Sequence, residues 1–270
     1  MFGNKCGMFF ILLTVQFEMV DDCVCRKQKA DDMKNNDNGI ITLSNSMAEC
    51  KISLFGGNVL SFVPKSQNYD VFWLGEKNKF DNTQAIRGGV PVCWPRFAEE
   101  KLNEHFPRHG FARLSMWHLD KLENEDNKSE AVLSLPKSEN YNLDVEVKLF
   151  VVLTDRLNCR MEVVNKSNEF FSFSEALHAY FYVSDKDKVV IKGLKGRQYK
   201  SSIDGKNYVL NGELQIKGEF DGAFANHNGV IEIEDIVFNR RIILEKSGSN
   251  STIVWNPNKD LKEMSQGQYK

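Results

Sequence analysis

Hydrophobic and polar residues alternate along most of the chain after residue 39. The pattern is clearest in the segment "NLDVEVKLFVVLT", residues 142–154. Every second residue there is apolar, and the intervening positions begin with Asp144, Glu146 and Lys148. A period of two predicts a β-strand with one buried face, because successive side chains of a strand point to opposite sides. The segment "RLNCRMEVVN" follows after a very short break, so the two segments are expected to form a hairpin.

The same pattern recurs in short segments separated by Gly, Asn and Asp. "AECKISLFGGNVLSFV" predicts two strands around a Gly-Gly turn, and further strands are predicted in "ARLSMWHLDKLE", "EAVLSLP", "GVIEIEDIVF", "RRIILEK" and "STIVW". Segments with the period of an amphipathic helix are scarce. The pattern therefore predicts an all-β fold, either a β-sandwich or a barrel. No internal repeat or shift of composition divides residues 39–270, which are expected to form one β domain.

Residues 1–38 differ from the rest of the chain. An apolar run from Met8 to Phe17 is followed by the polar stretch "RKQKADDMKNNDNG", which is typical of a linker. The run is too short to span a bilayer as a helix, and it resembles the core of a signal peptide without a clear cleavage site. Two interpretations stay open: a secretory signal, or an accessory segment at a poorly assigned start of the gene.

The composition of the 270 residues is that of a globular protein, with 41% hydrophobic and 27% charged residues. The formal net charge of −2 gives no indication of a nucleic-acid or membrane-surface partner. Any positive charge that holds an anionic ligand must therefore be local. The 6 cysteines show no zinc-type spacing and are expected to be reduced thiols.

One predicted strand, "FSFSEALHAYFYV", has two unlike faces. Phenylalanine and leucine dominate one face, whereas the other carries Ser172, Ser174, His178, Tyr180 and Tyr182. Hydroxyl groups and aromatic rings with little charge are what a sugar-binding groove needs. The alternative is an ordinary solvent-facing strand with an incidental histidine.

Two segments with arginine precede this strand. In "AIRGGVPVCWPRF", Arg87 stands before two glycines, which permit a close backbone approach, and in "FPRHGFAR" Arg108, His109 and Arg113 lie within six positions. Arginine forks suit phosphate or carboxylate oxygens, and a neighbouring histidine can donate a hydrogen bond or a proton. Rigid loops with solvent-facing arginines are the alternative. His105 and His109 have no third metal ligand nearby, so neither a metal nor another cofactor is expected.

Four segments in this order, "AIRGGVPVCWPRF", "RHGFAR", "EALHAYF" and "VWNP", resemble the glucose-6-phosphate 1-epimerase (hexose-6-phosphate mutarotase) branch of the aldose 1-epimerase family. The resemblance extends over roughly residues 40–269 and includes the earlier segments "SNSMAECKISLFGGNVLSFVP" and "VFWLGEKNKFD". It implies a large antiparallel β-sandwich of the galactose mutarotase type, with the sugar in a groove on one sheet. The alternating pattern agrees with such a sandwich but does not by itself select it.

The resemblance also implies a reaction, the interconversion of the α and β anomers of a hexose 6-phosphate by acid–base ring opening and reclosure. His178 falls on the family's catalytic histidine, the expected acid toward the ring oxygen. His109 falls on a second histidine that binds near the sugar ring. Arg87 and Arg113 fall on substrate-binding arginines and are expected on the phosphate side. This chemistry requires neither a metal nor a cofactor.

Three further positions complete the comparison with the family pattern. Asp221, in "KGEFDGAF", loosely resembles the family's aspartate that holds sugar hydroxyls. Arg108 is expected to contact the substrate at a position that is often glutamine. Asn258 follows "WNP" where tryptophan is common, which implies different local packing.

The largest departure from the family lies at the C-terminus. The family continues there into a last strand that carries the catalytic glutamate base, whereas this sequence reaches Tyr269 and Lys270 without it. Three interpretations stay open: an active epimerase, a sugar-phosphate-binding protein that has lost catalysis, and a truncated gene product. A sheet without that strand is expected to have an open edge. We expect a cytoplasmic monomer whose partner is its hexose 6-phosphate substrate.

Overall fold

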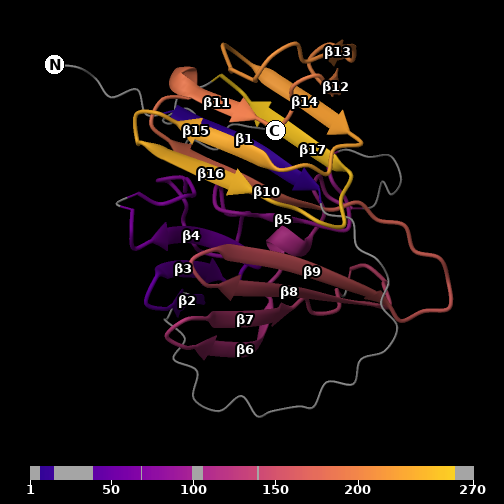
Figure 1. Ribbon diagram of the computed structural model, residues 1–270. Coiled ribbons are helices and arrows are strands. Elements are labelled where there is room, and N and C mark those ends of the chain that lie inside the picture. The colour runs from indigo at the N-terminus through magenta and orange to yellow at the C-terminus, as the bar shows by residue number, and fades with distance from the viewer. Residues whose placement is uncertain (1–6, 15–38, 68, 99–105, 139, 259–270) are drawn as a thin grey trace.

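The computed structural model describes residues 7–14, 39–67, 69–98, 106–138 and 140–258, and these residues form an almost entirely β structure (Figure 1). Its strands are β1 (Gly7–Thr14), β2 (Ile40–Ser44), β3 (Ala48–Ser53), β4 (Asn58–Pro64), β5 (Val92–Cys93), β6 (His118–Asn124), β7 (Ser129–Ser134), β8 (Val145–Leu153), β9 (Leu157–Asn165), β10 (Ala176–Val183), β11 (Val189–Lys192), β12 (Gln198–Ser201), β13 (Asn207–Val209), β14 (Phe220–Ala225), β15 (Ile231–Asp235), β16 (Arg240–Leu244) and β17 (Ser251–Asn256). Short 3-10 helices lie at η1 (Ala112–Leu114) and η2 (Lys186–Lys188).

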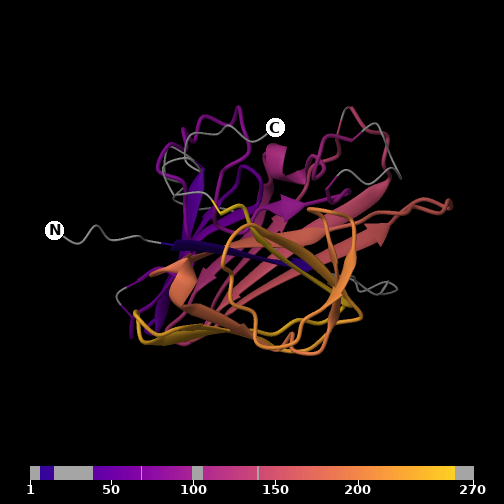
Figure 2. The same ribbon diagram turned by 90° about the horizontal axis from the view of Figure 1, so that it is seen from above.

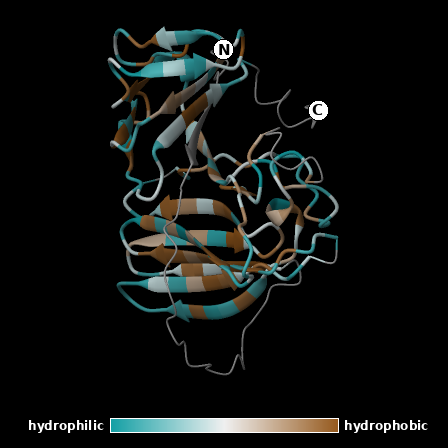
Figure 3. Cartoon of the chain, turned by 90° about the vertical axis from the view of Figure 1, so that its right-hand side faces the viewer, coloured by the Kyte–Doolittle hydropathy of each residue, from teal (hydrophilic) through white to brown (hydrophobic). Residues whose placement is uncertain are grey.

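Two sheets fill the lower half of Figure 1, and their strands follow one another along the chain. Strands β2 to β4 form one sheet and β6 to β9 the other. The predicted hairpin is confirmed, because β8 and β9 pair from Val145 with Asn165 to Leu153 with Leu157. Hydrophobic and hydrophilic residues alternate along these strands in Figure 3. The predicted period of two is confirmed by the buried residues of β8, which are Val147, Leu149, Val151 and Leu153.

A seven-stranded sheet crosses the upper half of the molecule, in the order β13-β12-β14-β17-β1-β10-β5. Strand β1 lies between β10 and β17 and pairs with both (Figures 1 and 2). Leu12 of β1 stands opposite His178 of β10 and opposite Ile253 of β17. Strand β17 pairs with β14 on one side and with β1, an apolar segment from the start of the chain, on the other. The expectation of an open edge is therefore wrong for β17.

Strand β10 is shorter than its sequence pattern predicts. It begins at Ala176 rather than at Phe171, because the segment that pairs with it, residues 89–95, ends near Pro95. The backbone N–H groups of Ser174, His178 and Tyr180 donate hydrogen bonds of 2.9–3.0 Å. Their acceptors are, in the same order, the carbonyl oxygens of Pro95, Pro91 and Gly89. A second difference lies at residues 112–114, where the predicted strand is replaced by η1 ahead of β6.

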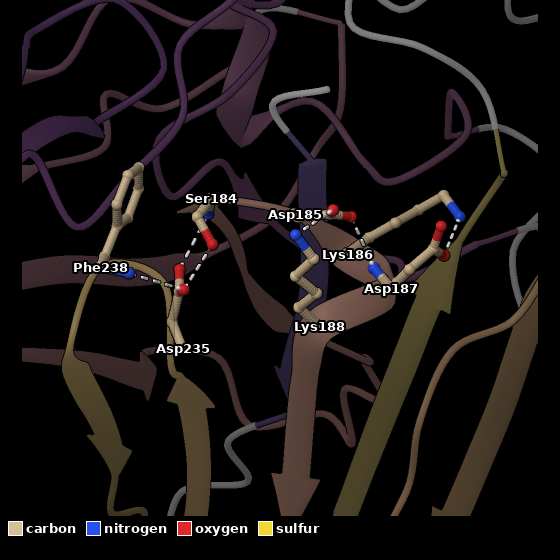
Figure 4. Close-up of polar contacts among 7 residues, drawn as sticks. All are labelled: Ser184, Asp185, Lys186, Asp187, Lys188, Asp235 and Phe238. Carbon is tan, nitrogen blue, oxygen red and sulfur yellow. Dashed lines mark hydrogen bonds and ion pairs between the residues drawn. The ribbon is translucent and has the colours of Figure 1, made fainter. Parts of the chain in front are cut away.

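The far end of β10 is fastened by a buried carboxylate (Figure 4). Asp235, at the end of β15, accepts hydrogen bonds from the Ser184 N–H at 2.8 Å, from the Ser184 hydroxyl, and from the Phe238 N–H at 3.1 Å. Ser184 directly follows β10, so these charge-assisted bonds tie the strand to the turn between β15 and β16. Asp185 beside it accepts from the Asp187 N–H and caps η2.

The thiols of Cys50, Cys93 and Cys159 are free, as predicted, and the other cysteines lie outside the described residues. Part of the signal-like run forms β1, whereas the predicted linker lies outside the described residues. In the part of the chain that the structure describes, no helix is both long and apolar enough to cross a membrane.

Candidate active site

His178 lies at the centre of the candidate site, on the face of β10 opposite to the core residues Leu177 and Phe181. The centroid of its ring lies 4.6 Å from that of Tyr180 and 6.4 Å from that of Trp255 on β17. Burial holds the pKa of the half-buried imidazole well below its usual value, and nearby cationic groups lower it further. The ring is therefore neutral in the structure.

Gly89 lets the segment that pairs with β10 pass close to the backbone of β4. Its φ is +68°, and a Cβ at this position would lie 2.2 Å from the carbonyl oxygen of Val59. Only glycine meets both conditions without strain. The close backbone approach predicted for the two glycines after Arg87 is confirmed.

His109 lies in the loop before η1, and its ring centroid is 6.1 Å from that of His178. The Ala98 N–H donates to His109 Nδ1 at 3.1 Å, so the proton of the neutral ring lies on Nε2. Burial, followed by the charge of Arg113 and of other arginines, lowers the pKa of His109 to about 3. His109 is thus a neutral hydrogen-bond donor at Nε2.

Arginines surround the two histidines. Arg87, Arg108 and Arg113 all contribute to the lowered pKa of both imidazoles. Arg113 donates from Nη2 to the carbonyl oxygen of Arg108 at 2.9 Å, and the Arg87 side chain is hydrogen-bonded to the phenol of Tyr180. Such a concentration of positive charge in a partly buried site suits an anionic ligand.

Asn78 fixes the backbone of Arg87, although the sequence did not single it out. Its Oδ1 accepts from the Arg87 N–H at 2.8 Å, and its Nδ2 donates to the carbonyl oxygens of Arg87 and Gly75 at 2.9 Å each. The available signal was weak: an asparagine shortly after a glycine, in "GEKN", is typical of turns whose side chain bonds the backbone.

Asp221 stands on the same sheet as His178 but not beside it. It lies opposite Trp255, and β14 is three strand positions from β10, roughly 14 Å at the usual spacing. Burial raises the pKa of its carboxyl, whereas a hydrogen bond with Ser202 and the charge of Arg108 lower it. Among the predicted site residues, Arg108 is the one whose charge acts on the carboxyl of Asp221.

The structure brings five of the six predicted site residues together and links Asp221 to them through Arg108. Arg87 and Arg113 are half-buried, so the alternative of solvent-facing arginines does not describe them, and Arg108 is exposed. His105 lies outside the described residues. No cluster of three or more potential metal ligands occurs within the described ranges.

This arrangement suits a polar, anionic ligand, and its two imidazoles suit the exchange of hydrogen bonds and protons with such a ligand. The family model described as aldose 1-epimerase matches residues 39–269. The chain therefore belongs to the aldose 1-epimerase family and is an isomerase that interconverts sugar anomers.

Known proteins support the same assignment. A protein of Escherichia coli (strain K12) named "Putative glucose-6-phosphate 1-epimerase" is 30% identical over 236 residues, which are 87% of this chain and 78% of that protein. A protein of the same name from Haemophilus influenzae is 31% identical over 207 residues, 76% of this chain and 72% of its own length.

Solved structures agree with the fold. The crystal structure of "a putative mutarotase" from Salmonella typhimurium has a TM-score of 0.74 at 28% identity and covers 81% of this chain and 74% of that one. The galactose 1-epimerase of Lactobacillus acidophilus has a TM-score of 0.52 at 13% identity, covers 93% of this chain and 98% of its own, and shows the fold alone. The predicted β-sandwich of the galactose mutarotase type is confirmed.

Proposed function

We propose that this chain interconverts the α and β anomers of a hexose 6-phosphate. One observation carries the proposal. The ring centroids of the neutral imidazoles of His109 and His178 lie 6.1 Å apart, and the charges of Arg87, Arg108 and Arg113 act on these rings. Imidazoles suit proton transfer at a sugar ring, and the arginines suit a phosphate. The names of the bacterial relatives, which specify glucose 6-phosphate, support the same substrate class.

In this proposal the substrate's phosphate offsets the charge of the arginines and lets His178 take up a proton. His178 then gives this proton to the ring oxygen while a base takes the proton of the C1 hydroxyl. The C1–O5 bond breaks, the aldehyde forms, the C1–C2 bond rotates, and the ring recloses with the proton transfers reversed. His109 donates its Nε2–H to a sugar oxygen, and Asp221 accepts hydrogen bonds from sugar hydroxyls. Arg87 and Arg113 hold the phosphate, and Arg108 contacts the substrate.

A second candidate is a protein that binds the sugar phosphate without accelerating its anomerisation. This candidate is favoured if no group of the chain acts as the base that takes the proton of the C1 hydroxyl. Loss of one partner of an acid–base pair typically lowers the rate by about 10²–10⁴. Spontaneous mutarotation would then hide most of the remaining activity.

The experiment that separates the two candidates follows the anomerisation of freshly dissolved α-glucose 6-phosphate. We expect a rate above the spontaneous rate for this chain and its loss in His178→Ala. His118→Ala, which replaces an exposed histidine on β6, is the matched control and should keep the rate. Absence of any acceleration, together with binding that weakens in Arg87→Ala, would favour the binding protein.

A further inference from the structure

His109 and Ala98 hold each other in an unusual conformation. Their φ angles are +63° and +55°, in the left-handed region that residues with side chains rarely adopt. The His109 N–H donates to the Ala98 carbonyl at 3.3 Å, and the Ala98 N–H donates to His109 Nδ1 at 3.1 Å. The ring of Phe97 lies 5.2 Å from the imidazole. The orientation and the tautomer of His109 therefore depend on where residues 97–98 lie.

Ser174 fixes this segment from the other side. Its hydroxyl accepts a hydrogen bond from the Phe97 N–H at 2.8 Å, and its own N–H donates to the Pro95 carbonyl at 3.0 Å. Ser174 stands just before β10, and His178 follows four positions later. It thus connects the segment that orients His109 with the strand that carries His178.

We propose that Ser174 is a positioning residue, which holds residues 97–98 so that His109 keeps its proton on Nε2. The inference rests on the function proposed above, since it assigns a role within the same site. With Nδ1 occupied by the Ala98 N–H, His109 offers a hydrogen-bond donor to the ligand and no free acceptor. Proton transfer to the ring oxygen is left to His178, so the two imidazoles have different tasks.

Loss of the Ser174 hydroxyl leaves the half-buried Phe97 N–H without its acceptor. Residues 97–98 then lose their hydrogen bond to the side chain of Ser174. The hydrogen bond from the Ala98 N–H to His109 Nδ1 is expected to loosen as a result. The imidazole of His109 becomes able to carry its proton on either nitrogen. Loss of a group that orients a metal-ligating histidine commonly changes activity by about 10–100-fold, and we expect the lower end of this range for a histidine that binds no metal.

Three variants and one control test the proposal. Ser174→Ala removes the acceptor, Ser174→Thr keeps it, and Ser174→Cys retains the size but is a weak acceptor. Ser172→Ala is the matched control, because Ser172 is exposed and, contrary to what the sequence pattern predicts, lies ahead of β10 and not on the strand face that carries His178. The readouts are the ¹⁵N chemical shifts of the His109 ring, assigned with His109→Gln, and the kcat and KM for α-glucose 6-phosphate.

We expect a single Nε2–H tautomer in the unmodified chain, in Ser174→Thr and in Ser172→Ala. Ser174→Ala and Ser174→Cys should show both tautomers and a kcat lower by about tenfold. An unchanged tautomer in both of these variants would overturn the proposal, whatever happens to the rate. If the unmodified chain does not anomerise the substrate, the ring signals still decide the role of Ser174, so the two failures are distinguishable.

Discussion

The charge state of the site depends on single residues. Burial keeps both histidines neutral, and the charges of Arg87, Arg108 and Arg113 add to this effect. A bound phosphate would offset the positive charge of these arginines. If these arginines hold the phosphate, as we propose, they also suppress protonation of the imidazoles until the ligand is present.

Inorganic phosphate is accordingly expected to raise the pKa of both His109 and His178. The measurement is an NMR titration of the imidazole signals with and without saturating phosphate. Arg87→Gln should reduce the increase, because it weakens phosphate binding. The exposed His118 on β6 is an internal control that should not respond. Identical titration curves of the site histidines in both conditions would contradict the phosphate assignment.

Glu175 is a second residue whose surroundings set its charge. It is 3% exposed, and neither carboxylate oxygen has a hydrogen-bond partner among the residues that the structure describes. Burial raises the pKa of this carboxyl from 4.5 to about 8. The folded protein therefore keeps a proton on Glu175 at neutral pH that the unfolded chain releases.

This difference makes stability depend on pH. Between pH 4.5 and about 8 the folded state binds one proton more than the unfolded state, so the free energy of unfolding falls as pH rises. The total decline is on the order of 5 kcal/mol. Denaturant unfolding at several pH values should show this fall in the free energy of unfolding. In Glu175→Gln the free energy of unfolding should depend much less on pH. Glu169→Gln, at an exposed position nearby, should leave the decline in place.

At the scale of elements, the sheet depends on β1. This strand pairs on both sides, and without it β10 and β17 have no ladder with each other in the described sheet order. It lies outside the 39–269 range that matches the family model. An N-terminal strand of this chain thus supports the strands that carry His178 and Trp255.

Ile11→Pro is expected to disturb both ladders, because proline removes a backbone N–H from a strand that is paired on both sides. The thermal midpoint should fall by about 3 °C or more, and amides of β10 and β17 should exchange faster with solvent. Ile11→Val keeps every backbone bond and serves as the control. Unchanged exchange of β10 and β17 in the proline variant would show that β1 does not hold them.

The elements differ in how well the sequence predicts them. Hairpins such as β8–β9 are predicted by a period of two and a short turn, because both signals are local. The position of β1 in the sheet cannot be predicted in this way, because nothing in "GMFFILLT" specifies which strands it joins. Likewise, the motifs with Arg87, His109 and His178 locate the site. The sequence does not single out Asn78, and it places Ser174 only on a polar strand face, because the roles of both residues arise from contacts with distant backbone groups.

At the scale of the whole molecule, the fold concentrates positive charge that the composition does not reveal. The formal net charge is −2, yet the charges of Arg87, Arg108 and Arg113 all act on one histidine, His178. These arginines come from two separate segments of the chain. Strands β10, β14 and β17 of the seven-stranded sheet carry residues 178, 221 and 255, respectively. The preference for a phosphorylated sugar that we propose would therefore be a property of the assembled site.

Equilibrium exchange NMR on α- and β-glucose 6-phosphate tests this account most directly. The exchange rate between the two anomers is measured with and without the protein, and the same is done with unphosphorylated glucose. We predict that the protein accelerates exchange of the 6-phosphate well above that of glucose. Equal acceleration of both sugars, or none of either, would contradict it.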